Sequence, residues 1–202
     1  DGALRGVVAT DKEENESTIF CKAVVLTPGT FLNGKIFVGS ECVHGGRKGE
    51  KAAVGLTDQL VDLGLRMTRL KTGTTPRLEA SSINYEKLEE QWGDARPRPS
   101  SYSNNFFTNG LAQPQICCHL TFTNERTHEI VRNNLNQSAL FRGEIVGVGP
   151  RYCPSVEDKI TRFPDKERHQ VFIEPESLST SQIYPNGIST SLPLDIQEQF
   201  LR

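Results

Sequence analysis

The sequence lacks the features that mark several classes of protein. Its 202 residues carry 23 basic and 25 acidic side chains, a net charge of −2. A strongly basic nucleic-acid-binding protein is therefore excluded, although a local basic patch is not. Apolar runs such as Ala23-Val24-Val25-Leu26 are far shorter than the roughly 18 residues of a membrane helix, and neither a secretory signal nor an Arg-rich transit peptide is evident. We expect a cytoplasmic protein without a membrane segment.

The five cysteines fit neither a disulfide framework nor a common zinc motif. Their number is odd, their spacing is irregular, and Cys117 and Cys118 are adjacent. No CxxC pair occurs, and the four histidines form no HxxxH pair. The sequence therefore predicts reduced thiols and no metal site.

The remaining composition is that of an ordinary globular protein. The chain is 36% hydrophobic, 24% charged and 7% aromatic, which suits one large domain or two small ones. The chain starts at Asp1, its one methionine is Met67, and the helical spacing of residues 192–201 has no stop signal after it. We expect this chain to be part of a longer polypeptide.

Local patterns predict a mixed α/β protein. Residues 23–26 are apolar without alternation, which is typical of a strand buried on both faces of a sheet. The turn chemistry predicts a hairpin tip at 11–17, a helix C-cap at Gly64 and a helix N-cap at Asn124. The predicted strands are residues 3–10, 18–27, 65–70, 116–122, 144–148 and 170–174, and the predicted helices are 51–64, 84–92 and 124–135. A change in composition places a domain boundary near residues 76–80.

The segment from Gly149 to Lys159 carries a candidate reactive thiol. Pro154 suits the first position of a helix, which would place Cys153 at the N-cap, where the helix dipole favours negative charge. Arg151 and Lys159 add positive charge nearby. The pattern predicts a nucleophilic thiolate.

Two acidic residues of the same segment oppose this interpretation. Glu157 and Asp158 disfavour a thiolate unless they pair with Lys159 or Arg162. The alternative for Cys153 is a buried structural cysteine, and the local sequence leaves both open.

Two further segments have the composition of ligand-binding turns. Lys71 to Arg77 places glycine and hydroxyl side chains between two cations, as an anion site requires, but without P-loop spacing, so a solvated surface turn is the alternative. Glu174 and Glu176 share one strand face ahead of residues 184–191. They suit acid–base chemistry or ribose binding, or alternatively a solvated strand end.

Taken together, these segments resemble one family. The matching stretches are AVVLTPGTFLNGKIFVG, GGRKGE, RLKTGTTPRL, TNERTHEIVRNNL, GVGPRYCPSVEDKITRF, IEPE and IYPNGISTSLP, in family order along nearly the whole chain. The chain is thereby identified as similar to the FAD-dependent tRNA uridine 5-carboxymethylaminomethyl modification enzymes, the glucose-inhibited division protein A family. The GxGxxG fingerprint of such flavoproteins is absent.

The resemblance implies an activity. Members modify C5 of the wobble uridine of tRNA using FAD, NADH and methylene-tetrahydrofolate as one-carbon donor, as a homodimer with a GTPase partner. It implies that Cys153 is a catalytic thiol, and a thiolate suits addition to C6 of uracil, which activates C5.

The resemblance also implies binding residues. Flavin contacts fall on Thr27, Gly29, Thr30 and Thr57, and phosphate or tRNA contacts on Arg47, Lys71, Arg77, Arg151 and Lys159. The segment that the family assigns to NAD comprises Gly149, Pro150, Arg151, Tyr152, Cys153, Pro154, Ser155, Val156, Glu157, Asp158, Lys159, Ile160, Thr161, Arg162 and Phe163.

The implied organisation is incomplete. Residues 1–76 would be the middle of a Rossmann-like FAD-binding domain, and residues 77–202 most of an inserted α/β domain resembling a nicotinamide-binding one. The GxGxxG part and a second family cysteine would precede Asp1, and the rest of the flavin domain and a helical tail would follow Arg202. We expect this piece alone to bind FAD poorly and to have no turnover. The alternatives are an inactive nicotinamide- or tRNA-binding module and the related folate- and FAD-dependent tRNA uridine methyltransferase, in which GPRYCPSVEDK is not expected.

Overall fold

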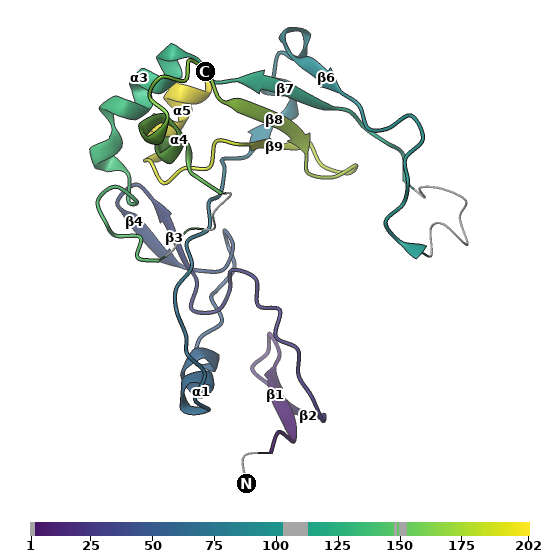
Figure 1. Ribbon diagram of the computed structural model, residues 1–202. Coiled ribbons are helices and arrows are strands. Elements are labelled where there is room, and N and C mark those ends of the chain that lie inside the picture. Colours follow the sequence, from purple (N-terminus) through teal and green to yellow (C-terminus); the bar gives the residue numbers. More distant parts are fainter. Residues whose placement is uncertain (1–2, 103–112, 148, 150–152) are drawn as a thin grey trace.

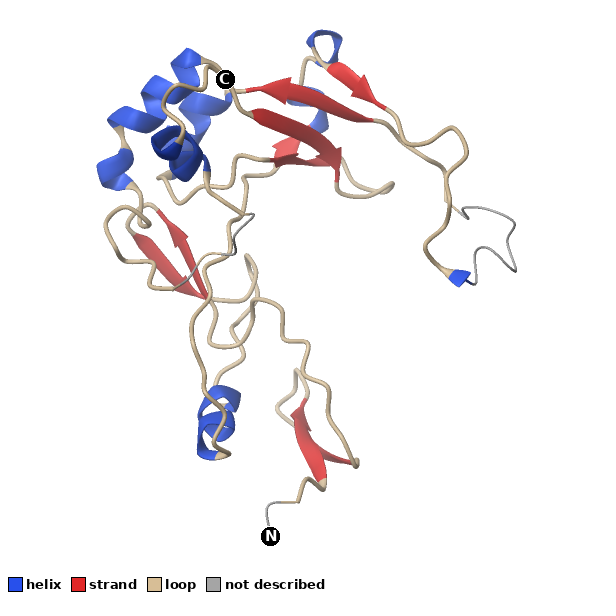
Figure 2. Ribbon diagram, in the orientation of Figure 1, coloured by secondary structure: helices blue, strands red, loops and turns tan. Residues whose placement is uncertain are grey.

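A five-stranded antiparallel sheet and three neighbouring helices form the larger part of this mixed α/β protein (Figures 1 and 2). The computed structural model describes residues 3–102, 113–147, 149 and 153–202. The strand order is β5-β9-β8-β7-β6, and every neighbouring pair is antiparallel. The strands are β5 (Leu78–Glu79), β6 (Glu89–Gln91), β7 (Cys118–Phe122), β8 (Gln170–Pro175) and β9 (Gln182–Asn186).

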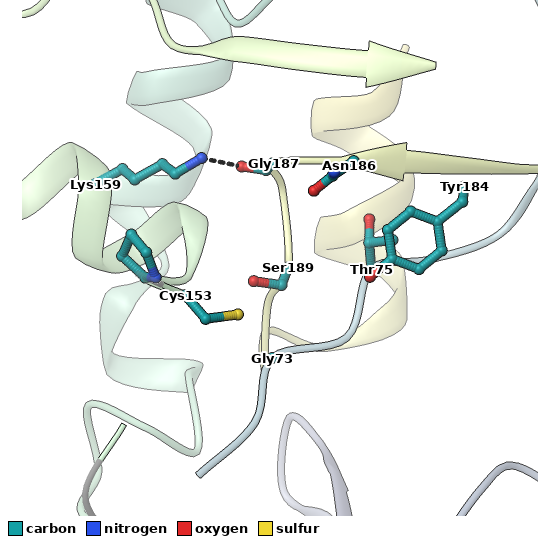
Figure 3. Close-up of a pocket in the computed structure, with 9 residues that line it drawn as sticks. Gly73, Thr75, Cys153, Lys159, Tyr184, Asn186, Gly187 and Ser189 are labelled. Carbon is teal, nitrogen blue, oxygen red and sulfur yellow. Dashed lines mark hydrogen bonds between the residues drawn. The ribbon is translucent and has the colours of Figure 1, made fainter. Parts of the chain in front are cut away.

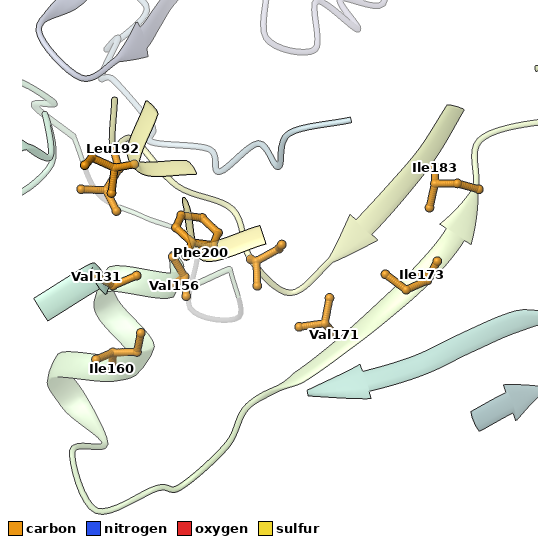
Figure 4. Close-up of a cluster of buried hydrophobic side chains, with 10 residues drawn as sticks. Val131, Val156, Ile160, Val171, Ile173, Ile183, Leu192 and Phe200 are labelled. Atoms are coloured by element: carbon orange, nitrogen blue, oxygen red, sulfur yellow. The ribbon is translucent and has the colours of Figure 1, made fainter. Parts of the chain in front are cut away.

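The hydrophobic core lies between this sheet and the helices (Figure 4). Strand β8 alternates as a half-buried strand should, with Val171 and Ile173 turned inward. Helices α3 (Glu125–Asn133), α4 (Val156–Arg162) and α5 (Leu194–Leu201) contribute the other side. The buried cluster consists of Val131, Val156, Ile160, Val171, Ile173, Ile183, Ile188, Leu192, Ile196 and Phe200.

Several local predictions are confirmed in this region. The strands predicted at 116–122 and 170–174 are β7 and β8. Asn124 caps α3, and its side chain accepts a hydrogen bond of 2.9 Å from Thr127 N. No helix in the described part of the chain has the length and apolarity that crossing a bilayer requires.

The first third of the chain consists of two hairpins and a short helix. Strands β1 (Gly6–Thr10) and β2 (Glu16–Phe20) form the predicted first hairpin, and β3 (Lys35–Val38) and β4 (Glu41–His44) form a second one within the glycine-rich stretch. Helix α1 (Leu56–Asp62) starts later than predicted, after Gly55 with a φ of 90°. Its C-cap is Leu63, one residue before the predicted Gly64. Gly64 follows with a φ of 86°, and the next N–H, of Leu65, donates to Leu60 O at 3.0 Å.

Of the strand predicted at 18–27, only the first residues form a strand, as part of β2, and the prediction of a buried strand at Ala23–Leu26 is wrong. These residues have no ladder partner in the part of the chain that the structure describes, and the Val25 side chain is 86% exposed. A strand buried on both faces requires neighbours that supply hydrogen bonds and cover, and apolar character alone does not provide them. The sheet that does form is antiparallel.

Three other predicted elements differ for local reasons. Residues 84–92 form one 3₁₀ turn (Tyr85–Lys87) and then β6, because that segment pairs with β7. Residues 65–69 form no strand. Residues 144–147 also form none, since Gly147 adopts a φ of 149° beside Arg69, and Val148 lies outside the described residues. Further 3₁₀ turns occupy Ala80–Ser82 and Leu135–Gln137.

The turn between β3 and β4 packs against the segment that leads into α5. Gly39 N donates to Ser191 O at 2.9 Å, and Arg142 Nη2 donates to Gly39 O at the same distance. A Cβ on Gly39 would lie 2.8 Å from Pro193 Cγ, so glycine is required for this close approach. The hairpin is thereby fixed to the helical end of the sheet.

Candidate active site

A cavity of about 120 Å³ lies where three segments far apart in sequence meet (Figure 3). One segment is the turn at residues 71–77, the second precedes α4, and the third is the end of β9 with the loop after it. The lining residues are Gly73, Thr75, Cys153, Pro154, Lys159, Tyr184, Asn186, Gly187 and Ser189. The structure thus brings the candidate thiol and the predicted anion turn into one site.

Backbone and hydroxyl hydrogen bonds fix the turn at residues 71–77 in this position. Thr190 N donates to Thr74 O at 3.0 Å, and the buried Thr75 Oγ1 donates to Pro185 O at 2.9 Å. A Cβ on Gly73 would lie 2.5 Å from Ser189 Oγ and 3.6 Å from Cys153 Sγ. The turn is therefore part of a packed interface and not a solvated surface turn.

The start of α4 differs from its prediction. The N-cap is Ser155 and not Cys153, so the thiol lies two residues before the cap. Ser155 Oγ accepts from Asp158 N at 3.1 Å, and Asp158 Oδ2 accepts from Ser155 N at 3.2 Å. This reciprocal pair needs a side-chain oxygen at the N-cap, which serine provides better than cysteine does. In Figure 3 the sulfur of Cys153 points toward Ser189.

Lys159 supplies the positive charge that the sequence placed near the thiol. Its ammonium donates to Gly187 O at 2.6 Å. Burial lowers the pKa of Lys159, the charge of Cys153 opposes that change, and Lys166 adds to it. Lys159 and Cys153 thus line the same cavity.

The two acidic residues of the segment differ in their partners. Asp158 pairs with Lys71 Nζ at 3.1 Å and with Arg162 Nη2 at 3.4 Å. Burial raises the pKa of Asp158, but the hydrogen bond and charge of Lys71 and the bonds from Ser155 together bring it below the usual range. Glu157 is fully buried, and its Oε1 accepts from Ser191 N at 3.0 Å. Asp158 is therefore charge-paired, whereas Glu157 keeps one buried oxygen, Oε2, that has no hydrogen-bond partner among the described residues.

Replacing Asp158 with asparagine should reduce the acid sensitivity of the fold. Because the folded pKa lies below the ordinary value of 3.8, the carboxylate stabilises the folded chain at neutral pH, and this contribution disappears as the pH falls through 3.8 and below. The variant should be less stable at pH 7 and should approach the wild type on acidification. Urea unfolding at several pH values measures this, and a stability difference that does not change with pH would contradict it.

A second basic residue of the turn packs beside the cavity. The Arg77 guanidinium carbon lies 4.3 Å from the centroid of the Tyr184 ring, and Arg77 forms an ion pair with Glu176. Asn186 Nδ2 donates to Glu174 at 3.1 Å. Glu174 thus holds Asn186, which lines the cavity. Glu176 holds Arg77, which packs on Tyr184, another residue of the lining.

Tyr184, Asn186 and Ser189 were not among the predicted site residues. The sequence feature that contains all three is the stretch YPNGISTS, which follows the two carboxylates Glu174 and Glu176. Its pattern alone does not assign these side chains to a site. Their hydroxyl and amide groups provide hydrogen-bonding partners for a polar ligand.

The predicted flavin residues lie outside this cavity. Thr27 and Gly29 are exposed, and Thr30 Oγ1 donates to Gly46 O at 2.6 Å. Thr57 Oγ1 is buried and has no hydrogen-bond partner within the described ranges of the chain. The unpartnered hydroxyl of Thr57 fits a contact to a bound cofactor. Arg47 also lies away from the cavity, in an exposed ion pair with Glu50.

The predicted NAD segment is divided between core, surface and cavity. Val156 and Ile160 belong to the hydrophobic core, and Thr161, Arg162 and Phe163 are exposed. A Cβ on Gly149 would lie 3.8 Å from Lys71 Cδ, so this residue lies beside the turn. Pro150, Arg151 and Tyr152 lie outside the described residues.

Comparison with known proteins agrees with the resemblance seen in the sequence. The model of the family described as glucose inhibited division protein A matches residues 2–202. The chain is 54% identical over 181 residues to the tRNA uridine 5-carboxymethylaminomethyl modification enzyme MnmG of Thermodesulfovibrio yellowstonii. The aligned residues cover 90% of this chain and 28% of that protein. It is 51% identical over 202 residues to MnmG of Geobacter sulfurreducens, covering all of the chain and 31% of that protein.

Solved structures give the same result. Aquifex aeolicus GidA in crystal form I superposes with a TM-score of 0.77 at 42% identity, covering 96% of this chain and 34% of that one. Crystal form II gives 0.79 at 40% identity, covering 99% and 31%. The chain thus spans about a third of the length of the proteins it matches, and it belongs to the glucose-inhibited division protein A family.

Proposed function

We propose that this chain supplies the thiol-bearing part of an enzyme that adds a carboxymethylaminomethyl group to C5 of the wobble uridine of tRNA. The observation that carries the proposal is that Cys153 lines a cavity together with Lys159 and several hydroxyl and amide side chains. The names of the relatives, which are tRNA uridine modification enzymes, support the substrate.

The chemistry we infer follows from the position of Cys153. Its thiolate donates an electron pair to C6 of uracil, an S–C6 bond forms, and the electrons of the C5–C6 double bond make C5 nucleophilic. C5 then attacks the one-carbon electrophile and loses its proton. Cleavage of the S–C6 bond restores the ring and the thiolate.

The cofactors and partners belong to the same proposal. FAD and NADH supply redox chemistry, methylene-tetrahydrofolate supplies the methylene carbon, and an amine co-substrate, glycine, supplies the carboxymethylamino part. A homodimer acts with a GTPase partner. Residues 1–76 would belong to the FAD-binding domain, with Thr57 toward the flavin, and residues 77–202 to the inserted domain. Exposed Arg47 suits a tRNA phosphate, while Lys71 and Arg77 are held in ion pairs beside the cavity.

A chimeric enzyme tests this function. The chain replaces the matching segment of Geobacter sulfurreducens MnmG, to which it is 51% identical over its full length. The chimera, with FAD, NADH, methylene-tetrahydrofolate, glycine, GTP and the partner GTPase, should modify unmodified tRNA at the wobble uridine. The parent enzyme is the control, and nucleoside mass spectrometry is the measurement.

The outcomes separate the alternatives. Appearance of 5-carboxymethylaminomethyluridine supports the proposal. A folded chimera that binds FAD and tRNA without product would indicate a binding module, and 5-methyluridine as the product would indicate the methyltransferase.

A further inference from the structure

Three metal-ligating side chains meet on one face of the sheet edge, away from the candidate active site. They are Glu90 on β6, Cys117 immediately before β7, and His119 on β7, and their ligand atoms all lie within 4.8 Å of one another. Cys117 Sγ lies 3.8 Å from His119 Nε2. We propose that these three residues bind a divalent transition-metal cation, with zinc as the fitting ion.

The strand register explains why the three side chains share a face. Glu90 is the direct cross-strand partner of His119, so their side chains leave the sheet on the same side. Cys117 precedes His119 by two residues, and side chains two residues apart in an extended chain point to the same face, so Cys117 lies on that face as well. Cys118, between them, is the partner of Gln91 and faces the other side. The neighbouring thiol is therefore excluded from the site by geometry.

The donor set and spacing suit zinc. Thiolate, imidazole and carboxylate are the three ligand types that Zn²⁺ uses in proteins, and bonds of about 2.0–2.3 Å place tetrahedral ligand atoms about 3.3–3.8 Å apart. The sulfur and the imidazole nitrogen already have this separation. Glu90 is exposed, so its carboxylate can approach by the remaining distance. Water would take the fourth position.

Two aromatic residues orient the ligands. Trp92 Nε1 donates to Glu90 Oε2 at 2.9 Å, which leaves Oε1 for the cation. The Tyr85 ring meets the His119 ring edge-on, with centroids 4.8 Å apart. Such supporting contacts fix ligand direction in known metal sites. Binding exchanges the thiol proton of Cys117 for the cation, and that proton is released to solvent.

The sequence alone predicted no metal site, because its cysteines and histidines form no metal-binding motif. Glu90 is distant in sequence from the other two ligands and becomes a neighbour through the pairing of β6 with β7. The proposed ion would link edge strand β6 to β7, and it is independent of the chemistry at Cys153.

Cobalt titration tests the site. The purified chain, stripped with a chelator and kept reduced with a phosphine, receives Co²⁺, whose thiolate charge-transfer band reports a Co–S bond. One equivalent should bind, and Zn²⁺ should displace it. Cys117→Ser should abolish the band, while the matched control Cys118→Ser should retain it. Glu90→Gln and Trp92→Phe should weaken binding by about 10- to 100-fold.

Other outcomes would overturn the proposal. They are no band at equimolar Co²⁺, a band that survives in Cys117→Ser, or unchanged affinity in Glu90→Gln. Far-ultraviolet circular dichroism confirms that each variant is folded. Glu90 and Trp92 are exposed, so we expect their variants to fold. If a cysteine variant unfolds, the metal affinity of these two variants still tests the site.

Discussion

Replacing Cys153 with serine in the chimeric enzyme should abolish wobble-uridine modification and leave flavin reduction by NADH intact. A serine hydroxyl is not ionised at neutral pH, so the addition to C6 loses its nucleophile. We expect a fall in modification rate of about 10³-fold or more. Modified nucleoside and flavin absorbance are followed separately in the same reaction.

Cys42→Ser is the matched control for this variant. Cys42 is an exposed free thiol on β4, outside the cavity, and its replacement should leave both rates unchanged. Loss of both activities in Cys153→Ser would indicate that the segment serves nicotinamide binding or local folding. If the variant retained both uridine modification and flavin reduction, Cys153 would be a structural residue and not the nucleophile.

Replacing Gly73 with alanine should destabilise the chain and close the cavity. The added Cβ would lie 2.5 Å from Ser189 Oγ and 2.8 Å from Ser189 Cβ, so the local packing must shift, and it would occupy cavity space 3.6 Å from Cys153 Sγ. Overpacking of this kind costs about 1–3 kcal/mol of unfolding free energy. Urea unfolding measures the loss. Slower alkylation of Cys153 would report that the cavity has closed.

Two comparisons isolate the steric cause. Gly93→Ala adds the same methyl group where the nearest heavy atom, Gln115 Oε1, lies at 3.8 Å, and it should have little effect by this mechanism. The double variant Gly73→Ala with Ser189→Gly removes both clashing atoms and should recover part of the lost stability. No recovery in the double variant would show that the Ser189 contact is not the source of the loss.

Local signals were reliable where one short segment contains all of its partners. Asn124 caps α3 through its own neighbour Thr127, and Gly64 lies directly after the C-cap of α1, within the same turn. The start of α4 shows the limit of this approach. Pro154 pointed to Cys153 as the N-cap, but the reciprocal bonds of Ser155 and Asp158 moved the cap by two residues.

Predictions that depended on distant partners were weaker. Ala23–Leu26 has the composition of a buried strand, yet the described residues supply no neighbour for it. Residues 84–92 have a helical pattern, yet part of the segment pairs with β7. In both cases hydrogen bonds with other segments, or their absence, outweighed local propensity.

The sequence by itself determined the family and the N-cap of α3 at Asn124, and it predicted Cys153 and the turn at residues 71–77 as candidates for a site. Each of these features lies within one short, contiguous segment of the chain. The tertiary structure decided that Cys153, Gly73 and Tyr184 line one cavity, and that Glu90 lies beside Cys117 and His119. These neighbours are set by strand register and by the packing of loops against one another, which arise from long-range contacts that no local pattern encodes.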